Sequence, residues 1–265
     1  MKNIYFIFLA LVFESCNHTI IFESGNVLKG SGKIITKTID INALTEVEQS
    51  SSIDVIINNN DTEKVTIETD DNIMQYVEYK IKNNKITFDF KNERSYNEIN
   101  PTKCRIYVYL KQLSKVENNG SGDIDINNFN NNFINVYNSG SGNINLYNIT
   151  LTNLTIKNDG SGEIKAINSI LNKVTINNEG SGDILMQGKA NISDITNGGS
   201  GNINTLNLFA NTTSVSNSGS GNIEVFVEKE ISIINNGYGD VKYKGNPSVK
   251  SINNNGSGDI ISACQ

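Results

Sequence analysis

The sequence predicts an all-β fold, a right-handed parallel β-helix with about eight regular rungs of 18–20 residues behind an irregular N-terminal lead-in. One observation is a Gly-x-Gly turn whose first glycine falls at positions 120, 140, 160, 180, 199, 219, 237 and 256. Another is a two-residue alternation of apolar and polar side chains between the turns. A third is the composition, rich in Ile, Val and Thr with 22 Gly and only 2 Pro, which favours strands joined by tight turns.

The alternation identifies the segments between turns as strands. In one repeat, Leu154 and Ile156 share a parity, and Ile164 and Ala166 share a parity after the turn. A period of two is that of a strand, and no segment carries a helical apolar stripe of useful length. Parallel crossovers favour the right hand. A period that drifts between 18 and 20 does not suit the hexapeptide pattern of left-handed coils.

Stacking of the repeats predicts two apolar columns, because one rung cannot bury its own apolar residues. The column before the turns contains Val116, Val136, Ile156, Ile176, Ile195, Val215, Ile233 and Ile252. The column after the turns contains Ile124, Ile144, Ile164, Ile184, Ile203, Ile223, Val241 and Ile260.

An asparagine stands two residues before every Gly-x-Gly turn. We expect these residues to form an internal ladder in which each amide bonds to the next, as in stacked cross-β rows. The ladder contains Asn118, Asn138, Asn158, Asn178, Asn197, Asn217, Asn235 and Asn254. The paired glycines are expected to have positive φ or to allow close backbone packing. Tyr238, which replaces the serine of one turn, is expected to bulge outward.

The Gly-rich turns admit two other interpretations. A phosphate cradle requires a helix after the glycine loop, whereas strands follow here. Calcium would require several oxygen ligands. An interrupted acidic column does follow the turns, but such a stripe is typical of a solvated face; calcium is left open and no cofactor is predicted. This column contains Asp123, Asn143, Glu163, Asp183, Asn202, Asn222, Asp240 and Asp259.

The N-terminus resembles a bacterial lipoprotein signal. Residues 1–15 contain Lys2 and an apolar run over 4–13 that is too short to span a bilayer. Cys16 would be the lipidated residue and 16–29 a tether; the alternative is an ordinary signal peptide with an incidental cysteine. The chain is therefore expected to be exported and lipid-anchored to the cell envelope at the outer membrane, with the periplasmic or surface side left open.

Residues 30–115 lack the repeat but contain alternating segments such as 65–69, 85–90 and 104–110. We expect them to cap the N-terminal end of the regular part, 116–265, so that 30–265 is one continuous domain. Cys104 and Cys264 flank the regular rungs. They should lie too far apart for an intrachain disulfide.

The order of these motifs resembles the head GIN domain family, adhesin-type proteins common among Bacteroidetes lipoproteins. The resemblance rests on Gly30-Ser-Gly32, the segments 65–72 and 104–113, and the serial Gly-Ser-Gly-x-Ile turns, and it covers 30–261. It implies a β-helix without shared catalytic residues and an adhesive role. The family defines no functional site residue that could be carried over.

The residues favour a non-catalytic structural or adhesion-type protein over an enzyme. No Arg or His follows Lys115, and the adjacent carboxylates Glu163 and Asp183 lie on a flat column without a pocket to shift a pKa. A polysaccharide-active enzyme is the less favoured alternative. A glycan-binding module is the other, although its candidate aromatics do not fall in one column: Tyr137, Tyr147, Phe226 and Tyr238.

The net charge of the chain and its open strand edge limit the kinds of partner that it can bind. A net charge of −6 with two Arg argues against nucleic acid. The remaining expectations are a membrane, reached through the lipid anchor, and a surface glycan or protein. The last rung also presents an open strand edge, which invites self-association.

Overall fold

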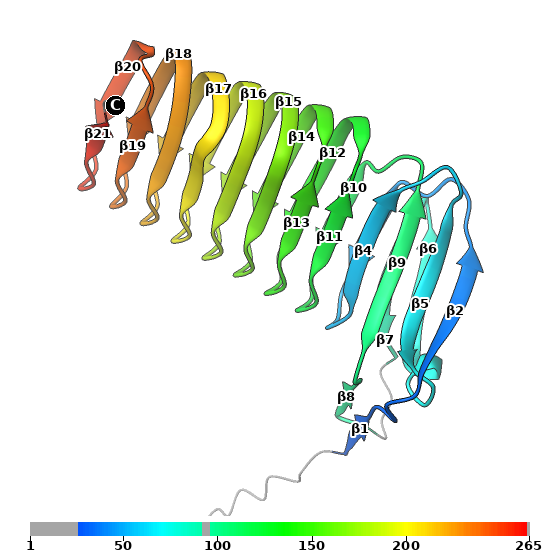
Figure 1. The fold of residues 1–265 in the computed structure, drawn as a ribbon. Helices are drawn as coiled ribbons and strands as arrows, with labels where there is room; N and C mark the ends of the chain where they lie inside the picture. The colour runs from blue at the N-terminus through cyan, green and yellow to red at the C-terminus, as the bar shows by residue number, and fades with distance from the viewer. Residues whose placement is uncertain (1–25, 92–95, 264–265) are drawn as a thin grey trace, which may run out of the picture.

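The computed structural model describes residues 26–91 and 96–263, and over these the chain is an all-β solenoid (Figure 1). The solenoid has about seven turns, which correspond to the complete repeats between the first and the last Gly-x-Gly corner. The predicted fold class is confirmed, and the handedness of the coil stays a prediction.

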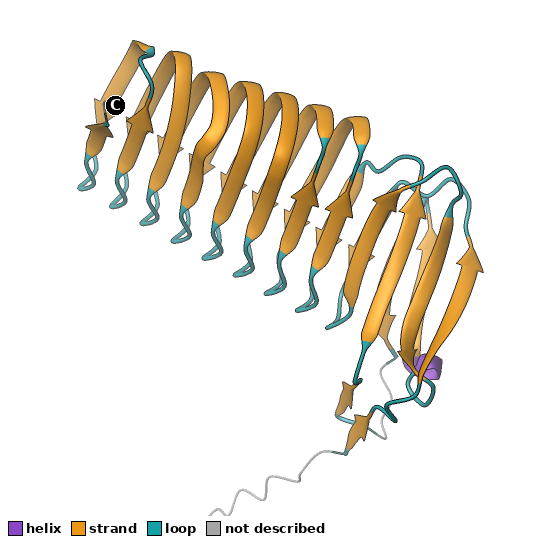
Figure 2. Cartoon of the chain, in the orientation of Figure 1, coloured by secondary structure: helices purple, strands orange, loops and turns teal. Residues whose placement is uncertain are grey.

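Each turn contributes a segment to two layers. The layers join at the Gly-x-Gly corners along one edge and at rounded corners along the opposite edge (Figure 2). Before the corners lie β10 (Lys115–Asn118), β12 (Asn130–Asn138) and β14 (Thr150–Asn158), and after them lie β11 (Ile124–Asn127) and β13 (Ile144–Tyr147). Four longer strands pass through the rounded corner and serve both layers: β15 (Ile164–Asn178), β16 (Ile184–Asn197), β17 (Ile203–Asn217) and β18 (Ile223–Asn235). The solenoid ends with β19 (Val241–Lys244), β20 (Ser248–Asn254) and β21 (Ile260–Ser262).

Successive rungs pair in parallel with the predicted register, so that Val116 lies beside Val136 and Ile124 beside Ile144. Both apolar columns are at most 3% exposed until the last rung. There Ile252 is 39% exposed, because no further described rung covers it. The expectation that Ile252 completes a buried column is therefore corrected.

Close approach of stacked corners explains the glycines. A Cβ on Gly160 would lie 2.1 Å from the carbonyl oxygen of Gly140, which accepts a hydrogen bond from the Ser161 amide at 3.0 Å. The positive φ values among the described glycines occur at Gly32, Gly188 and Gly245, all outside the repeated corners. The corners therefore use glycine for space between rungs, and the positive-φ alternative is wrong for them.

The rung that precedes the regular stack is formed out of chain order. β3 (Glu46–Gln49) pairs in parallel with β10, and β4 (Asp54–Asn59) pairs in parallel with β11. Gln49 thereby occupies the ladder position below Asn118. Two strands of the segment expected as a lead-in thus form a rung of the stack itself.

A cap closes the N-terminal end. β7 (Lys85–Phe90) and β9 (Cys104–Leu110) pair in parallel with β3 and β4. Antiparallel strands then end each layer: β6 (Val77–Lys82) pairs with β7, β5 (Lys64–Asp70) pairs with β9, and β2 (Ile34–Asp40) pairs with β5. The short 3₁₀ helix η1 (Met74–Tyr76) connects β5 to β6. The cap has its own buried residues, including Phe88 and Ile73.

A buried carboxylate holds the cap together. Asp70 accepts hydrogen bonds from the Gly32 amide at 2.7 Å, the Thr102 amide at 2.8 Å and the Thr102 hydroxyl at 2.7 Å. Burial alone would raise the pKa of Asp70, but these hydrogen bonds outweigh it and hold the pKa below its ordinary value. Asp70 therefore joins the chain before β2 to the segment before β9.

The first described strand lies within the segment expected as a tether. β1 (Val27–Lys29) pairs in parallel with β8 (Glu98–Asn100), so the last three residues of 16–29 belong to the fold. The expected signal over 1–15, Cys16 and Cys264 lie outside the described residues. Within 26–91 and 96–263, no helix has the length and apolar character needed to cross a membrane.

Candidate binding surface

The asparagine ladder runs inside the solenoid. The first seven of its side chains are at most 1% exposed. Asn158 donates to Oδ1 of Asn178 at 3.1 Å, and Asn178 donates to Oδ1 of Asn197 at 3.2 Å. Each of these amides also donates to the carbonyl of the second glycine in the next corner, for example Asn178 to Gly201 at 3.2 Å. The first seven amides of the ladder therefore bond within the protein, whereas Asn254 in the last rung is exposed.

The column after the corners forms a second ladder. Oδ1 of Asp123 accepts the backbone amide of Asn143 at 2.8 Å, and Oδ1 of Asp183 accepts that of Asn202 at 2.7 Å. The same contact recurs from Asp54 in the first rung to Asp240 in the last but one. These side chains bond the corner of the next rung, and several of them, Asp183 and Asn202 included, are also solvent-exposed, so the column is a solvated face that links the rungs.

This second ladder bears on the calcium and enzyme alternatives. Asp183 is bound to the next rung, and Oε2 of Glu163 accepts a hydrogen bond from Nζ of Lys165 at 2.9 Å. The two carboxylates stand on adjacent rungs, yet each is engaged by a different partner. Among the residues that the structure describes, no group of three or more His, Cys, Asp or Glu side chains is placed to hold a metal ion.

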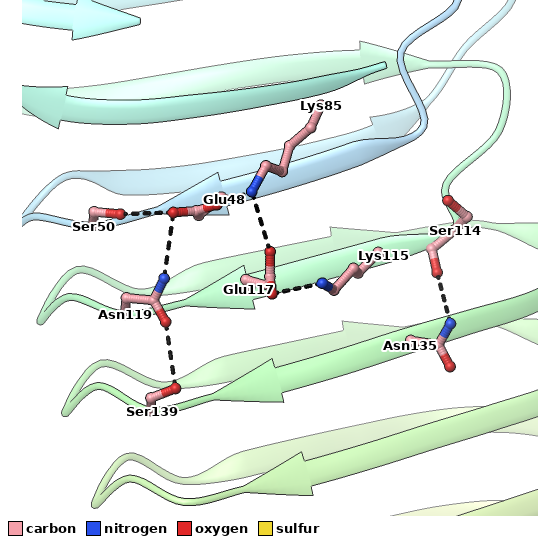
Figure 3. A network of polar contacts seen from close by, with 9 residues as sticks. All are labelled: Glu48, Ser50, Lys85, Ser114, Lys115, Glu117, Asn119, Asn135 and Ser139. Carbon is pink, nitrogen blue, oxygen red and sulfur yellow. Dashed lines mark hydrogen bonds and ion pairs between the residues drawn. The ribbon is translucent and has the colours of Figure 1, made fainter. Parts of the chain in front are cut away.

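A charged network connects the cap to the first rungs (Figure 3). Lys85 forms an ion pair with Glu48 and lies 3.6 Å from Glu117, which also pairs with Lys115 at 2.6 Å. The hydrogen bond to Glu48 is the main reason that the pKa of Lys85 is raised. The charges of this face are therefore engaged in joining β7, β3 and β10.

A charged hollow of about 280 Å³ opens on the other layer, and it is lined by Asp54, Arg105, Asp123, Asp125 and Tyr147 among others. Its acids have protein partners. Asp54 lies 3.8 Å from Arg105, and Asp125 accepts a hydrogen bond from Asn145 at 2.9 Å. The acidic side chains Asp54 and Asp125 of this hollow are thus bound by other side chains of the protein.

Cys104 lies beside a further hollow, near β8. It is a buried free thiol, and burial raises its pKa to about 11. The thiol is therefore protonated at neutral pH, which marks it as a packing residue and not a nucleophile.

The aromatics singled out in the sequence do not converge. The amine of Lys115 lies 5.1 Å from the ring centre of Tyr137, and Phe226 packs edge-on against Phe209 at 5.0 Å. Tyr238 is 76% exposed at its corner, as expected. No platform of several exposed rings is built from them.

An uncharged groove lies along the rounded edge of the solenoid. The chain turns into this edge at Asn128, Asn148 and Asn168, whose φ values of 63°, 55° and 56° lie in the left-handed region. Asparagine tolerates that region because its side chain bonds locally. Here Asn148 donates to Oδ1 of Asn128 at 3.1 Å, and Asn168 to Oδ1 of Asn148 at 3.2 Å.

The groove has a volume of about 540 Å³, and it crosses the rungs from β12 to β16. The nearly buried Leu151 and Leu171 form its floor, and polar side chains and the exposed Ile170 stand above them. The lining comprises Gln112, Asn130, Asn131, Asn132, Thr150, Leu151, Thr152, Ile170, Leu171, Asn172 and Asn191. Near it the register of the β15–β16 pair shifts between Ala166 and Ser169, and Gly188 of β16 has φ 137°.

Sequence reasoning did not find this groove. The segments 130–132 and 150–152 alternate like any other part of the strands, so periodicity gave no reason to set them apart. The available signal was the asparagine that recurs at 128, 148 and 168, because asparagine at a fixed spacing marks a turn.

The fold has solved counterparts. A family model described as "Putative auto-transporter adhesin, head GIN domain" matches residues 43–247. A "putative adhesin" from Parabacteroides distasonis is 22% identical over 90% of this chain and 100% of its own, with a TM-score of 0.80. A "putative lipid binding protein" from the same organism is 22% identical over 89% and 100%, with a TM-score of 0.75. A "putative adhesin" from Bacteroides fragilis is 23% identical over 89% and 100%, with a TM-score of 0.69. No curated protein matches the chain.

Proposed function

The chain belongs to the head GIN domain family, and on that premise we propose that it is a non-catalytic adhesion-type protein of the cell envelope. The observation that carries the proposal is the way polar side chains are used. The amides inside and the carboxylates beside the corners bind the next rung, and the charged face at the cap is internally paired. The surface left for a partner is long, repetitive and, at the rounded edge, uncharged.

Attachment to the envelope is assigned to Cys16. Acyl chains contribute about 0.8 kcal/mol for each buried CH₂ group, and the apolar run before Cys16 is typical of an export signal. The outer membrane is the proposed location. Incorporation of a labelled fatty acid into the wild-type chain, and its loss in Cys16→Ala, would be the expected result. Equal labelling of both chains would contradict the anchor.

Adhesion is tested with the soluble chain, residues 17–265, and a panel of soluble and insoluble polysaccharides. Both co-sedimentation and bond cleavage are scored. Binding without cleavage is expected. Cleavage would overturn the proposal and would direct attention to Glu163 and Asp183.

The C-terminal edge supports a second proposal, self-association through a second copy. Val249, Ile252 and Ile261 are 48%, 39% and 42% exposed there. The strand edges of β20 and β21 have no partner on their outer side among the described residues. Two identical edges can pair antiparallel about a twofold axis and cover these apolar residues, which yields a closed dimer.

A further inference from the structure

We propose that the groove at the rounded edge binds a neutral glycan chain, laid along the solenoid axis with about one sugar unit for each rung. This inference rests on the proposed adhesion function and names its ligand class. The groove is defined by residues of β12, β14, β15 and β16 together with Gln112.

The first argument is charge. Every residue that lines the groove is an amide, a hydroxyl or an aliphatic side chain. A uronate, sulfate or phosphate group would lose hydration there without gaining a cation, which disfavours an acidic polymer. A neutral ligand meets no such penalty. The hollow beside Asp54 and Arg105 and the network around Lys85 show that charged surface is available elsewhere on the same molecule.

The second argument is hydrogen-bonding type. Asparagine and glutamine amides and threonine hydroxyls each offer both donors and acceptors, and so do sugar hydroxyls. At the base, Asn131 donates to the carbonyl of Leu113 at 2.6 Å, whereas its Oδ1 is shielded from solvent and has no partner among the described atoms. An acceptor in that state is costly, by about 1–3 kcal/mol. The polar groups open to a ligand are those of the exposed Asn132, Thr152 and Asn172.

The third argument is periodicity. One wall presents Asn132, Thr152, Asn172 and Asn191 on successive rungs, and the rungs are about 4.8 Å apart. That spacing is close to the length of one monosaccharide unit in an extended chain. The same polar group on each rung can therefore contact the same hydroxyl group on each sugar unit of a regular polymer. Ile170, which also lines the groove and is 59% exposed, provides an apolar contact for the C–H face of a sugar ring.

Two other occupants fit less well. A peptide that adds to a sheet requires a free backbone edge, but the backbones at Thr150 and Leu151 are paired with the rungs on both sides. An acyl chain requires apolar area, and the floor leucines Leu151 and Leu171 are only 4% and 5% exposed. The groove therefore offers mainly polar and some apolar side chains to a ligand, and a neutral glycan is the ligand that matches this mixture.

The test measures binding of the soluble chain to neutral cello- and xylo-oligosaccharides and to acidic oligogalacturonate by calorimetry, with insoluble cellulose, chitin and starch by co-sedimentation. The groove variant combines Thr152→Val and Asn172→Leu, which remove hydrogen bonds from exposed positions. The matched control combines Thr196→Val and Ser216→Ala on the outer face of β16 and β17, where a different shallow hollow lies. Circular dichroism and thermal unfolding establish that all variants are folded.

We expect binding of at least one neutral glycan, a loss of about tenfold or more in the groove variant, since two hydrogen bonds are removed, and no change in the control. Equal binding by the groove variant would overturn the groove and leave glycan adhesion in place. Stronger binding to oligogalacturonate would overturn the neutral class. A separate assay scores adhesion of the immobilised chain to cells. A wild-type chain that binds no glycan but adheres to cells would overturn this inference alone, whereas failure in both the glycan and the cell assay would overturn the proposed function as well.

Discussion

The two ends of the solenoid are built in opposite ways. At the N-terminal end the parallel layers pass into antiparallel strands, and Phe88 and Ile106 are fully buried beneath them. At the C-terminal end the last rung repeats the pattern of the others, and Val249 and Ile252 are left 48% and 39% exposed. The difference teaches that a repeat sequence specifies its own stacking but does not specify how stacking stops. Stopping requires a different sequence.

The side chains that fill the interior also change from the N-terminal rungs to the later rungs. The first rungs enclose apolar side chains, whereas Ser193 and Thr213 replace them further on and are 1% exposed. Their hydroxyls have no hydrogen-bond partner among the described atoms. Register shifts also occur in β16, β17 and β18. We therefore expect amide hydrogen exchange to be slowest near β10 and β12 and fastest near β20.

Substitution of corner glycines should give the largest difference in stability between the interior and the C-terminal end. Gly180→Ala places a Cβ 2.1 Å from the carbonyl oxygen of Gly160, with rungs on both sides. We expect it to lower the free energy of unfolding by about 3 kcal/mol or more. Gly256→Ala makes the same contact with Gly237, but its rung can shift outward, and a loss of about 1 kcal/mol is expected. Urea denaturation compares the two, and equal losses would contradict the account.

The ladder should show the next effect. Asn178→Ala removes donors to Asn197 and Gly201 and an acceptor for Asn158, all of them buried. A loss of about 2–3 kcal/mol is expected. Asn254→Ala removes one part-buried bond to Gly258 and should cost about 1 kcal/mol or less. Thermal unfolding measures both, and a larger effect at 254 would mean that the ladder contributes little to the interior.

The cap should be sensitive to acid. The folded pKa of Asp70 lies below its ordinary value of 3.8. Its contribution is therefore fully present above about pH 4 and is lost as the pH falls through the folded pKa. Asp70→Asn should reduce stability at neutral pH by about 1–3 kcal/mol. It should also weaken the dependence on pH below 4, as followed by unfolding at a series of pH values. An unchanged acid profile in the variant would assign that dependence to other carboxylates.

The smallest effect on stability is expected at the open edge. Ile252→Lys changes a side chain that is already 39% exposed, so unfolding should be nearly unaffected. Sedimentation velocity over a range of concentrations should show association in the wild type and its loss in this variant. Phe133→Lys, at a residue 50% exposed far from the edge, is the matched control. A wild-type chain that stays monomeric at high concentration would remove the self-association proposal.

Much of the solenoid was predictable, because identical residues at a constant spacing fix both register and burial. Ile124 and Ile144 could be aligned without a structure. The segment 52–57 was interpreted as a degenerate first strand, but its place in a rung of the stack was not predicted, although Gln49-Ser-Ser-Ser-Ile-Asp54 matches Asn118-Asn-Gly-Ser-Gly-Asp123 position by position. The glycines are absent there because the Cβ of each corner points at the preceding corner. This first rung stacks on no Gly-x-Gly corner.

The groove was beyond sequence reasoning for a different reason. Its walls, Thr152 and Asn172 among them, are defined by where the chain bends, and that depends on the left-handed turns at Asn148 and Asn168. A two-residue period is the same on a flat strand and on a bent one. The alternation of the sequence therefore could not reveal where the strands bend or where the groove lies.

The out-of-order rung has a consequence for how the polypeptide reaches its native state. Because β3 and β4 pair with β7 and β9 on one side, the cap can assemble before the repeats arrive. It then presents a finished template onto which β10 and β11 can add, followed by each later rung in the order of its emergence. Nucleation is required once, at the amino end, and elongation proceeds like growth of a one-dimensional crystal. The unfinished surface always belongs to the rung that was added last.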